Sequence, residues 1–256
     1  MIKPDESVNI NNESESRRIR TSRVCGLHHI ATNVKRITLC GDDVDSFLLN
    51  SRTQLPAAWI KVLFPDGLNY AARAYTLSGL NKFAGTIDFD MVLHGSGPAV
   101  RWAKNAQIGD VVGFAGPGPG GFALNPKSKW LLLIVDEAGI PAMKSILTSL
   151  PSNLPVILFV GVESSVGITQ LTHSNLIAQY SAISSLKGES AMRMLVQQAI
   201  DEQVLPASEG QAWIATEADD ARYLKQWLIE AEIFKPTAIF SRGYWKKGVK
   251  GFNDTP

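Results

Sequence analysis

The sequence predicts two domains, an antiparallel Greek-key β-barrel followed by a small doubly wound parallel α/β domain. Residues 24–115 hold short alternating segments broken by Gly, Pro, Asn and Asp, which is typical of antiparallel strands in a barrel or sandwich. After residue 129, continuous apolar segments alternate with helical patterns, which indicates a parallel sheet covered on both faces. The length of 256 residues allows two domains.

Composition narrows the classes of partner. Residues 1–16 are polar, so we expect a disordered tail, then a barrel domain over 17–125 and an α/β domain over 126–256. The net charge of +1 favours no nucleic-acid partner. The longest apolar run, Trp130–Val135, is far short of the roughly 20 residues of a membrane span. We therefore expect a cytoplasmic protein with no membrane partner.

The barrel half contains six expected strands and one helix. The helix covers residues 97–107, because Pro98 stands near its first position and Gly109 just after its end. The expected strands are 29–34, 36–40, 59–64, 73–77, 86–93 and 110–115.

The α/β half is expected to contain five strands and three helices. The strands are 130–135, 156–160, a weaker one at 175–180, 212–215 and 237–244; the helices are 137–150, 190–202 and 218–230. Between the two halves, Gly116, Gly118 and Gly121 match a G-x-G-x-x-G spacing, but prolines interrupt it and no helix pattern follows. We interpret this segment as an interdomain linker.

The sequence contains no recognisable motif for a protein-borne nucleophile or a metal site. His28, His29, His94 and His173 have no Cys or carboxylate at ligand spacing on one element. Cys25 and Cys40 have no redox or nucleophile motif, and we interpret them as small buried hydrophobic residues. Any catalysis is therefore expected to come from a cofactor.

Two segments of the barrel half contain residues suited to a cofactor. Alternation places Arg73, Tyr75 and Leu77 on one face of a strand and Thr76 on the other. A ring beside a guanidinium can flank a planar ring system and neutralise a phosphate. The alternative is an ordinary surface strand with a mixed face.

The second segment runs from residue 88 to residue 103. It contains Asp90, Val92, His94 and Gly95 on and after a strand, and then a helix that begins with small residues at Gly97, Pro98 and Ala99. Small residues at a helix start let backbone amides approach an anion, to which the helix dipole adds attraction. The alternative is an ordinary helix that caps the barrel.

The order of these motifs resembles the siderophore-interacting protein family of FAD-containing ferric-siderophore reductases. The similar segments are Arg-x-Tyr-Thr, Asp-x-Asp-x-Val-Leu-His-Gly, Gly-Pro-Ala-x-x-Trp-Ala, Asp136-Glu-Ala-Gly-Ile-Pro-Ala142, Trp213-Ile-Ala-Thr-Glu217 and Gly243-Tyr-Trp-Lys-Lys-Gly248. The resemblance covers about residues 20–250 and implies a ferredoxin-reductase-like fold, with FAD on the barrel and NADH or NADPH on the α/β domain.

The resemblance also implies roles for individual residues. FAD would contact Arg73, Tyr75, Thr76, Asp90, Val92, His94, Gly95, Tyr244 and Trp245, with helix-start amides from Gly97, Pro98 and Ala99. Tyr244 and Trp245 have the alternative role of C-terminal core aromatics. Thr216 stands where related chains have glycine, before Glu217, and a β-branched residue does not easily adopt a positive φ. This departure affects the expected nicotinamide site and favours another donor, such as a ferredoxin.

The expected function is reduction of a ferric siderophore to release Fe(II), with flavin passing electrons one at a time. Anionic chelates would be attracted by a basic cluster of Lys61, Lys129, Lys246 and Lys247, each of which is alternatively a solvated surface charge. Two other functions remain open: a general NAD(P)H:flavin or ferredoxin-type oxidoreductase, and a non-catalytic siderophore-binding iron carrier.

Overall fold

The computed structural model describes residues 17–93, 95–118, 121–162, 173–183, 190–249 and 252. The chain divides into two compact units, Met1–Phe122 and Ala123–Pro256, and each is described by itself. The division falls shortly before the expected boundary at residue 125. The tail expected over residues 1–16 and the predicted site residue His94 lie outside the described residues.

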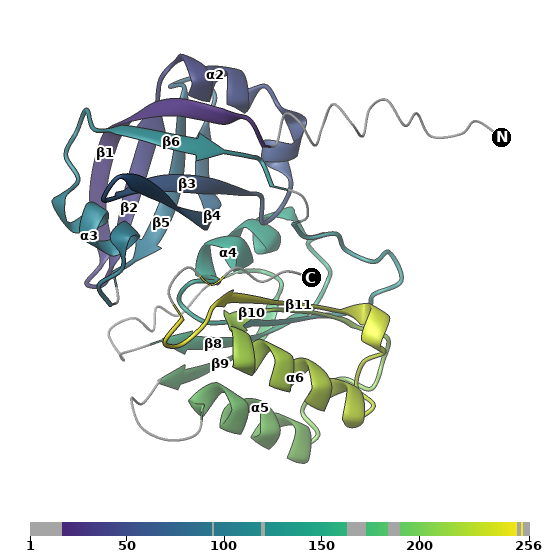
Figure 1. Cartoon of the computed structure of the whole chain (residues 1–256). Helices are drawn as coiled ribbons and strands as arrows, with labels where there is room; N and C mark the ends of the chain where they lie inside the picture. Colours follow the sequence, from purple (N-terminus) through teal and green to yellow (C-terminus); the bar gives the residue numbers. More distant parts are fainter. Residues whose placement is uncertain are drawn as a thin grey trace. The chain divides into compact units, whose positions relative to one another are not determined.

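The first unit is a closed antiparallel barrel in the order β1-β2-β5-β4-β3-β6. Its helices α2 (Asp42–Leu48) and α3 (Pro98–Asn105) cover opposite ends of the barrel (Figure 1). The predicted antiparallel barrel is confirmed. The strands are β1 (Ile19–Ala31), β2 (Val34–Cys40), β3 (Trp59–Asp66), β4 (Asn69–Asn81), β5 (Thr86–Val92) and β6 (Val111–Ala115).

The first expected strand, 29–34, is wrong. β1 begins ten residues earlier, at Ile19, and residues 32–33 form the turn into β2. The sequence hides this strand because two of its inward positions are polar. Arg20 and Ser22 are buried, and they donate hydrogen bonds to the carbonyl oxygens of Gly116 (3.0 Å) and Val112 (2.8 Å). Helix α2 was not expected either.

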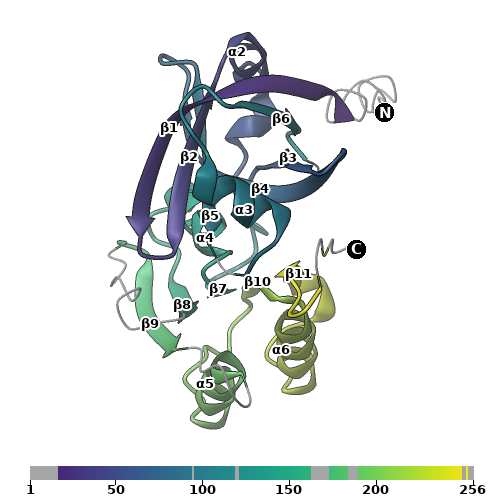
Figure 2. The same cartoon turned by 60° about the vertical axis from the view of Figure 1, so that its left-hand side comes forward.

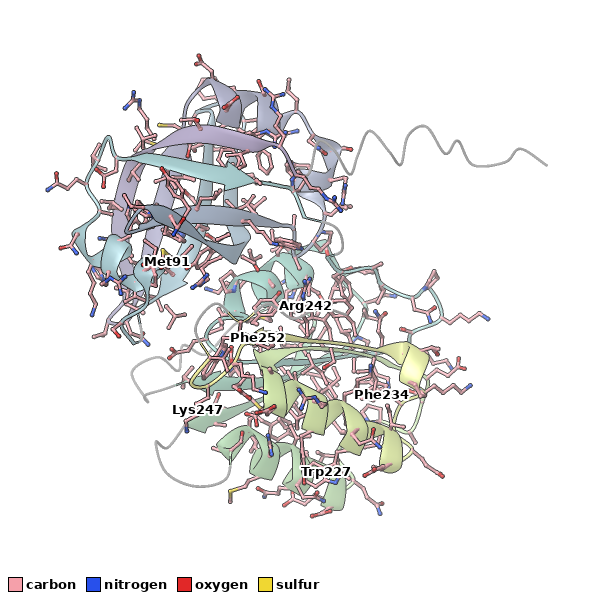
Figure 3. All side chains as sticks on the ribbon, viewed as in Figure 1. Met91, Trp227, Phe234, Arg242, Lys247 and Phe252 are labelled. Atoms are coloured by element: carbon pink, nitrogen blue, oxygen red, sulfur yellow. The ribbon has the colours of Figure 1, made fainter. Side chains whose placement is uncertain are left out.

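Alternating inward side chains fill the barrel. Met91 lies among them, inside the barrel in Figure 3. The fully buried members include Ile37, Leu39, Ile60, Val62, Phe64, Ile87, Phe89 and Phe114. Burial of this apolar surface is the main stabilising contribution to the unit.

The second unit is a parallel sheet in the order β11-β10-β7-β8-β9, with α5 and α6 on one face and α4 on the other (Figures 1 and 2). The predicted doubly wound α/β fold is confirmed. The strands are β7 (Leu131–Val135), β8 (Val156–Val162), β9 (Leu176–Ile183), β10 (Gln211–Glu217) and β11 (Ile239–Trp245). The helices are α4 (Ile140–Ser149), α5 (Ala191–Asp201) and α6 (Ala218–Glu230).

Both faces of this sheet are apolar, which explains the continuous hydrophobic runs in the sequence. All five residues of β7 are buried. Helices α5 and α6 cover a core that includes Trp130 and Phe234, whose rings lie 5.1 Å apart. No helix in the described part of the chain is long and apolar enough to cross a membrane.

Candidate functional site

The start of α3 is an open helix N-terminus on the barrel unit. Its N-cap residue Gly97 offers no side chain to the first-turn amides, and the first turn carries no acidic residue. A Cβ atom added at Gly97 or at Gly95 would meet nothing within 4 Å. Gly95 has a φ of +73°, a conformation that glycine adopts without strain. Free amides, the positive end of the helix dipole and open space together suit an anion.

Packing holds this helix against the barrel. Ala99 and Ala103 are buried, and the ring of Trp102 lies 5.1 Å from that of Phe64. At the other end of the helix, Lys35 Nζ donates to the carbonyl oxygen of Ala103 at 2.6 Å, where a cation complements the helix dipole. The amides at the start of α3 are therefore on a fixed support.

One predicted role at this helix start is wrong. Pro98 is the first residue of α3, and a proline has no amide hydrogen to donate. The donors left at this end are the amides of Gly97 and of the residues after Pro98, beginning with Ala99. This donor set fits a phosphate or pyrophosphate of a dinucleotide such as FAD.

The strand β4 carries Arg73, Tyr75 and Thr76 next to β3. Arg73 and Tyr75 pair with Val62 and Ile60, whose side chains face the barrel interior, and Thr76 pairs with Trp59 on the opposite face. The predicted alternation is confirmed.

Tyr75 packs as a core aromatic residue. Its ring lies 5.0 Å from that of Phe89 and 5.9 Å from that of Phe64, and burial raises the pKa of its phenol. Arg73 is half-buried and donates to the carbonyl oxygen of Ala72 at 2.7 Å. Contact of these side chains with a flavin stays a prediction.

Asp90, on the outer face of β5, already has its hydrogen-bond acceptors occupied. Arg36 donates to both carboxylate oxygens, at 2.7 and 2.9 Å, and the Ser78 hydroxyl donates at 2.9 Å. Because the Asp90 side chain is only 8% exposed, the ion pair compensates the cost of burying its charge. Asp90 thus joins β2, β4 and β5, and Val92 follows on the same outer face.

In the α/β unit, Asp136 at the end of β7 is a hydrogen-bond acceptor for several elements. Trp245 Nε1 at the end of β11 donates to it at 2.7 Å, and the Ala138 amide donates at 2.9 Å. Burial raises the pKa of Asp136 to about 6, against the lowering effect of these hydrogen bonds and of the Gly139 and Glu217 amides.

Glu217 is the N-cap of α6. Its Oε2 accepts from the amides of Asp219 and Asp220, at 2.7 and 3.2 Å, and its Oε1 accepts from the Lys247 amide at 3.0 Å. Together Asp136 and Glu217 tie the end of β11 to the ends of β7 and β10. Their carboxylates accept hydrogen bonds from backbone amides at the starts of α4 and α6.

The backbone at Thr216 does not have the positive φ that a β-branched residue avoids. Thr216 lies within β10 and is 2% exposed, and its φ is not positive. Its hydroxyl donates to the carbonyl oxygen of Glu217 at 3.1 Å. An extended strand position accepts a β-branched residue readily, so φ imposes no cost here.

The four predicted lysines do not form one cluster. Lys129 precedes β7, whereas Lys246 and Lys247 follow β11 at the opposite end of the same parallel sheet. Five residues of β7 separate these edges by roughly 16 Å. Lys61 belongs to the other unit, on the outer face of β3.

The two lysines after β11 differ in their surroundings. Lys246 pairs with Asp219 at 3.1 Å. Lys247 is exposed (Figure 3), and its side chain has no ion pair within the described ranges. The aromatic residues before them, Tyr244 and Trp245, are half-buried, and the Tyr244 ring makes an edge contact with Trp213.

Sequence reasoning missed the roles of Asp136, Arg36 and Lys35. Asp136 directly follows the most apolar strand, and a carboxylate at the carboxyl end of a parallel strand is a recognisable site signal. Arg36 and Lys35 gave no comparable signal, because their partners lie more than 50 residues away along the chain.

Comparisons with known proteins agree with this architecture. The siderophore-interacting FAD-binding domain matches residues 53–121, and the siderophore-interacting protein family matches residues 128–248. Ferric vibriobactin reductase ViuB of Vibrio cholerae is 24% identical over 245 residues, covering 86% of either chain. Ferric acinetobactin reductase of Acinetobacter baumannii is 27% identical over 184 residues, 70% of this chain and 62% of that protein.

Solved structures share the fold. A siderophore utilization protein from T. fusca superposes with a TM-score of 0.78 at 23% identity, covering 92% of this chain and 95% of that one. A ferredoxin NADP+ reductase from Neisseria gonorrhoeae, whose structure has bound FAD and NADP, gives 0.67 at 16% identity, covering 89% and 99%. The family matches and the open helix start on the barrel lead to one assignment. The chain belongs to the siderophore-interacting protein family, with FAD as its cofactor.

Proposed function

We propose that the protein is an FAD-dependent oxidoreductase that reduces the Fe(III) of a ferric siderophore and so releases Fe(II). Relatives named as ferric vibriobactin reductase and ferric acinetobactin reductase support this activity. The observation that carries the proposal is the uncapped, open start of α3 within the matched FAD-binding domain.

In this scheme, residues of the chain bind FAD and orient it. Amides at Gly97 and Ala99 would hold a phosphate of FAD, and Arg73 would supply a positive charge from β4. Bound FAD supplies single electrons to an acceptor. Each Fe(III) takes up one electron and becomes Fe(II), which the siderophore holds less tightly. No side chain needs to act as a general base.

Lys247 is the proposed attractant for anionic chelates at the carboxyl edge of the α/β sheet. Its ammonium is exposed, whereas the charge of Lys246 is largely compensated by Asp219. A free positive charge raises the local concentration of an anionic substrate. Lys61 is a second proposed attractant, on the barrel unit.

The electron donor is proposed to be a ferredoxin, with NADH and NADPH as the alternatives. The carboxylates of Asp136 and Glu217 already accept hydrogen bonds from amides at the starts of α4 and α6. A dinucleotide's phosphates would have to compete with these negative charges. This competition favours a protein donor.

A pair of variants tests the proposed cofactor site. Gly97 has extended backbone angles, and a side chain there meets nothing, so Asp or Asn at this position would cap α3 equally well. Gly97→Asp adds a negative charge at the anion site, and Gly97→Asn is its neutral control. We expect FAD to bind the Asp variant about tenfold more weakly than the Asn variant. Titration of apoprotein by flavin fluorescence measures this, and equal affinities would contradict the proposed site.

Trapping of Fe(II) by a coloured chelator tests the activity. Photoreduced, flavin-loaded protein should convert an anionic ferric tris-catecholate to Fe(II), and Lys247→Ala should slow this step more than Lys246→Ala does. Flavin reoxidation by dioxygen but not by any ferric chelate would indicate a general flavin oxidoreductase. Chelate binding without reduction would indicate an iron carrier, and either result would overturn the proposal.

A further inference from the structure

The two cysteines of the chain lie on adjacent strands, β1 and β2, on the outer surface of the barrel. Cys25 is exposed and Cys40 is half-buried. Their neighbours Val24 and Leu39 are buried in the barrel core, so alternation directs both thiols outward. The expectation that both are buried hydrophobic residues is therefore wrong.

A β-bulge brings Cys25 towards Cys40. Val24 pairs with Leu39 and Gly26 pairs with Thr38, which leaves Cys25 as the extra residue of β1. In a bulge, two residues of one strand face one residue of its partner, so Cys25 shares the place opposite Leu39. Cys40 is the next residue of β2. In a regular ladder, Cys25 would instead face Thr38, two positions from Cys40.

The residue after Cys25 permits this close approach. A Cβ atom at Gly26 would lie 2.8 Å from Thr38 Oγ1 and 2.9 Å from Thr38 Cβ, so a larger residue would push the two strands apart. The bulge therefore depends on glycine at this position.

Both thiols reach across the gap between the strands. Cys25 Sγ donates to the carbonyl oxygen of Thr38 at 3.6 Å, and Cys40 Sγ donates to that of Arg23 at 3.7 Å. Partial desolvation raises the pKa of Cys25 to about 12, and the neighbouring Cys40 adds to the rise. The two thiols therefore lie beside each other across the β1–β2 ladder.

We propose that Cys25 and Cys40 form an oxidisable dithiol that a low-molecular-weight disulfide converts into a disulfide across the β1–β2 hairpin. One of the two thiols, as its thiolate, attacks one sulfur of oxidised glutathione, whose S–S bond breaks, and one glutathione leaves with a proton. The other thiol then loses its proton and attacks the cysteine sulfur of the mixed disulfide, which releases the second glutathione. The protein loses two electrons and two hydrogens, and the glutathione disulfide gains both.

This site goes beyond the proposed iron chemistry and does not depend on it. The new bond would close the hairpin between residues 25 and 40 and hold β1 to β2 at the bulge. A bond that restricts the unfolded chain raises thermal stability. Oxidation would therefore stabilise the barrel unit, and reduction would reverse the change.

Mass spectrometry of the full-length protein tests the proposal. Reduced protein is treated with oxidised glutathione at mildly alkaline pH. We expect wild-type protein to lose the mass of two hydrogens, to retain no glutathione, and to yield a peptide pair joined through Cys25 and Cys40. Cys25→Ser should instead retain one glutathione on Cys40, because the second thiol is missing. The unfolding temperature should rise on oxidation of the wild type only and fall again with dithiothreitol.

Other outcomes overturn the proposal. They are stable glutathione adducts on wild-type protein, a disulfide between two copies of the chain, and two thiols that stay free throughout. The wild-type measurement decides by itself, so a serine variant that fails to fold leaves the test intact. Cys40→Ser is the matched control, and we expect it to retain one glutathione on Cys25.

Discussion

Asp136 should make the stability of the α/β unit depend on pH in a window set by its raised pKa. The carboxyl group titrates near 6 in the folded protein, against 3.8 for an ordinary aspartate. At about 1.36 kcal/mol per pH unit, this difference corresponds to about 3 kcal/mol. The cause is burial, which the hydrogen bonds from Trp245 and nearby amides offset only in part.

The sign follows from proton counting. Between pH 3.8 and 6 the folded protein holds more protons on Asp136 than the unfolded chain does. The free energy of unfolding therefore falls as pH rises through this window, and the contribution is fully present only below it. In Asp136→Asn this contribution is absent. We expect the difference in unfolding free energy between wild type and variant to change by about 2 kcal/mol between pH 7 and pH 4, and to reach its full size only at lower pH.

Nuclear magnetic resonance of the indole groups provides the assay. Loss of the folded Trp213 indole signal in urea reports unfolding of the α/β unit, because Trp213 is buried in β10. The Trp245 signal, identified by its loss in Trp245→Phe, reports titration directly, because its Nε1 donates to Asp136. We expect it to shift with a midpoint near pH 6. A midpoint near 4, or a stability difference that is independent of pH, would refute the reasoning.

Two further predictions concern packing and charge. Arg36→Ala should destabilise the barrel by about 2 kcal/mol in chemical denaturation, because the 8% exposed Asp90 side chain loses its counter-charge. Ser78→Ala removes only one hydrogen bond to Asp90 and should destabilise the barrel less. Equal losses of stability in the two variants would contradict this prediction. Gly139→Ala should cost about 1–3 kcal/mol, because its Cβ would lie 2.6 Å from the Ala215 carbonyl oxygen. Gly113→Ala, whose Cβ would make only ordinary contacts at 3.5 Å or more, is the matched control and should change the unfolding temperature little.

Parts of the candidate site could be predicted because they are local. The start of α3 could be read from Gly97 and Pro98, since helix-start preferences act over one turn of chain. The alternation of Arg73 and Tyr75 along β4 is likewise a property of any strand. The alternation alone does not assign these residues to FAD. That role came from the resemblance to the siderophore-interacting protein family.

Other parts depended on partners distant in the chain. Asp90 was expected to face a cofactor, and only the pairing of β2 with β5 places Arg36 beside it. The lysines were expected to form one cluster, whereas the direction of the parallel strands puts Lys129 and Lys247 at opposite edges of the sheet. Sequence position alone gives neither the register of a ladder nor the edge at which a loop lies.

The sequence by itself determined the classes of the two units. Period-two alternation and continuous apolar runs are direct consequences of how many faces of a sheet are buried, so they are visible before any fold is known. The tertiary structure alone decided which polar groups meet. The buried Arg20 and Ser22 of β1, the acceptor role of Asp136 and the approach of Cys25 to Cys40 all depend on contacts between residues on different strands. Hydrogen bonds and bulges act across strands, and a linear sequence does not record which strands are neighbours.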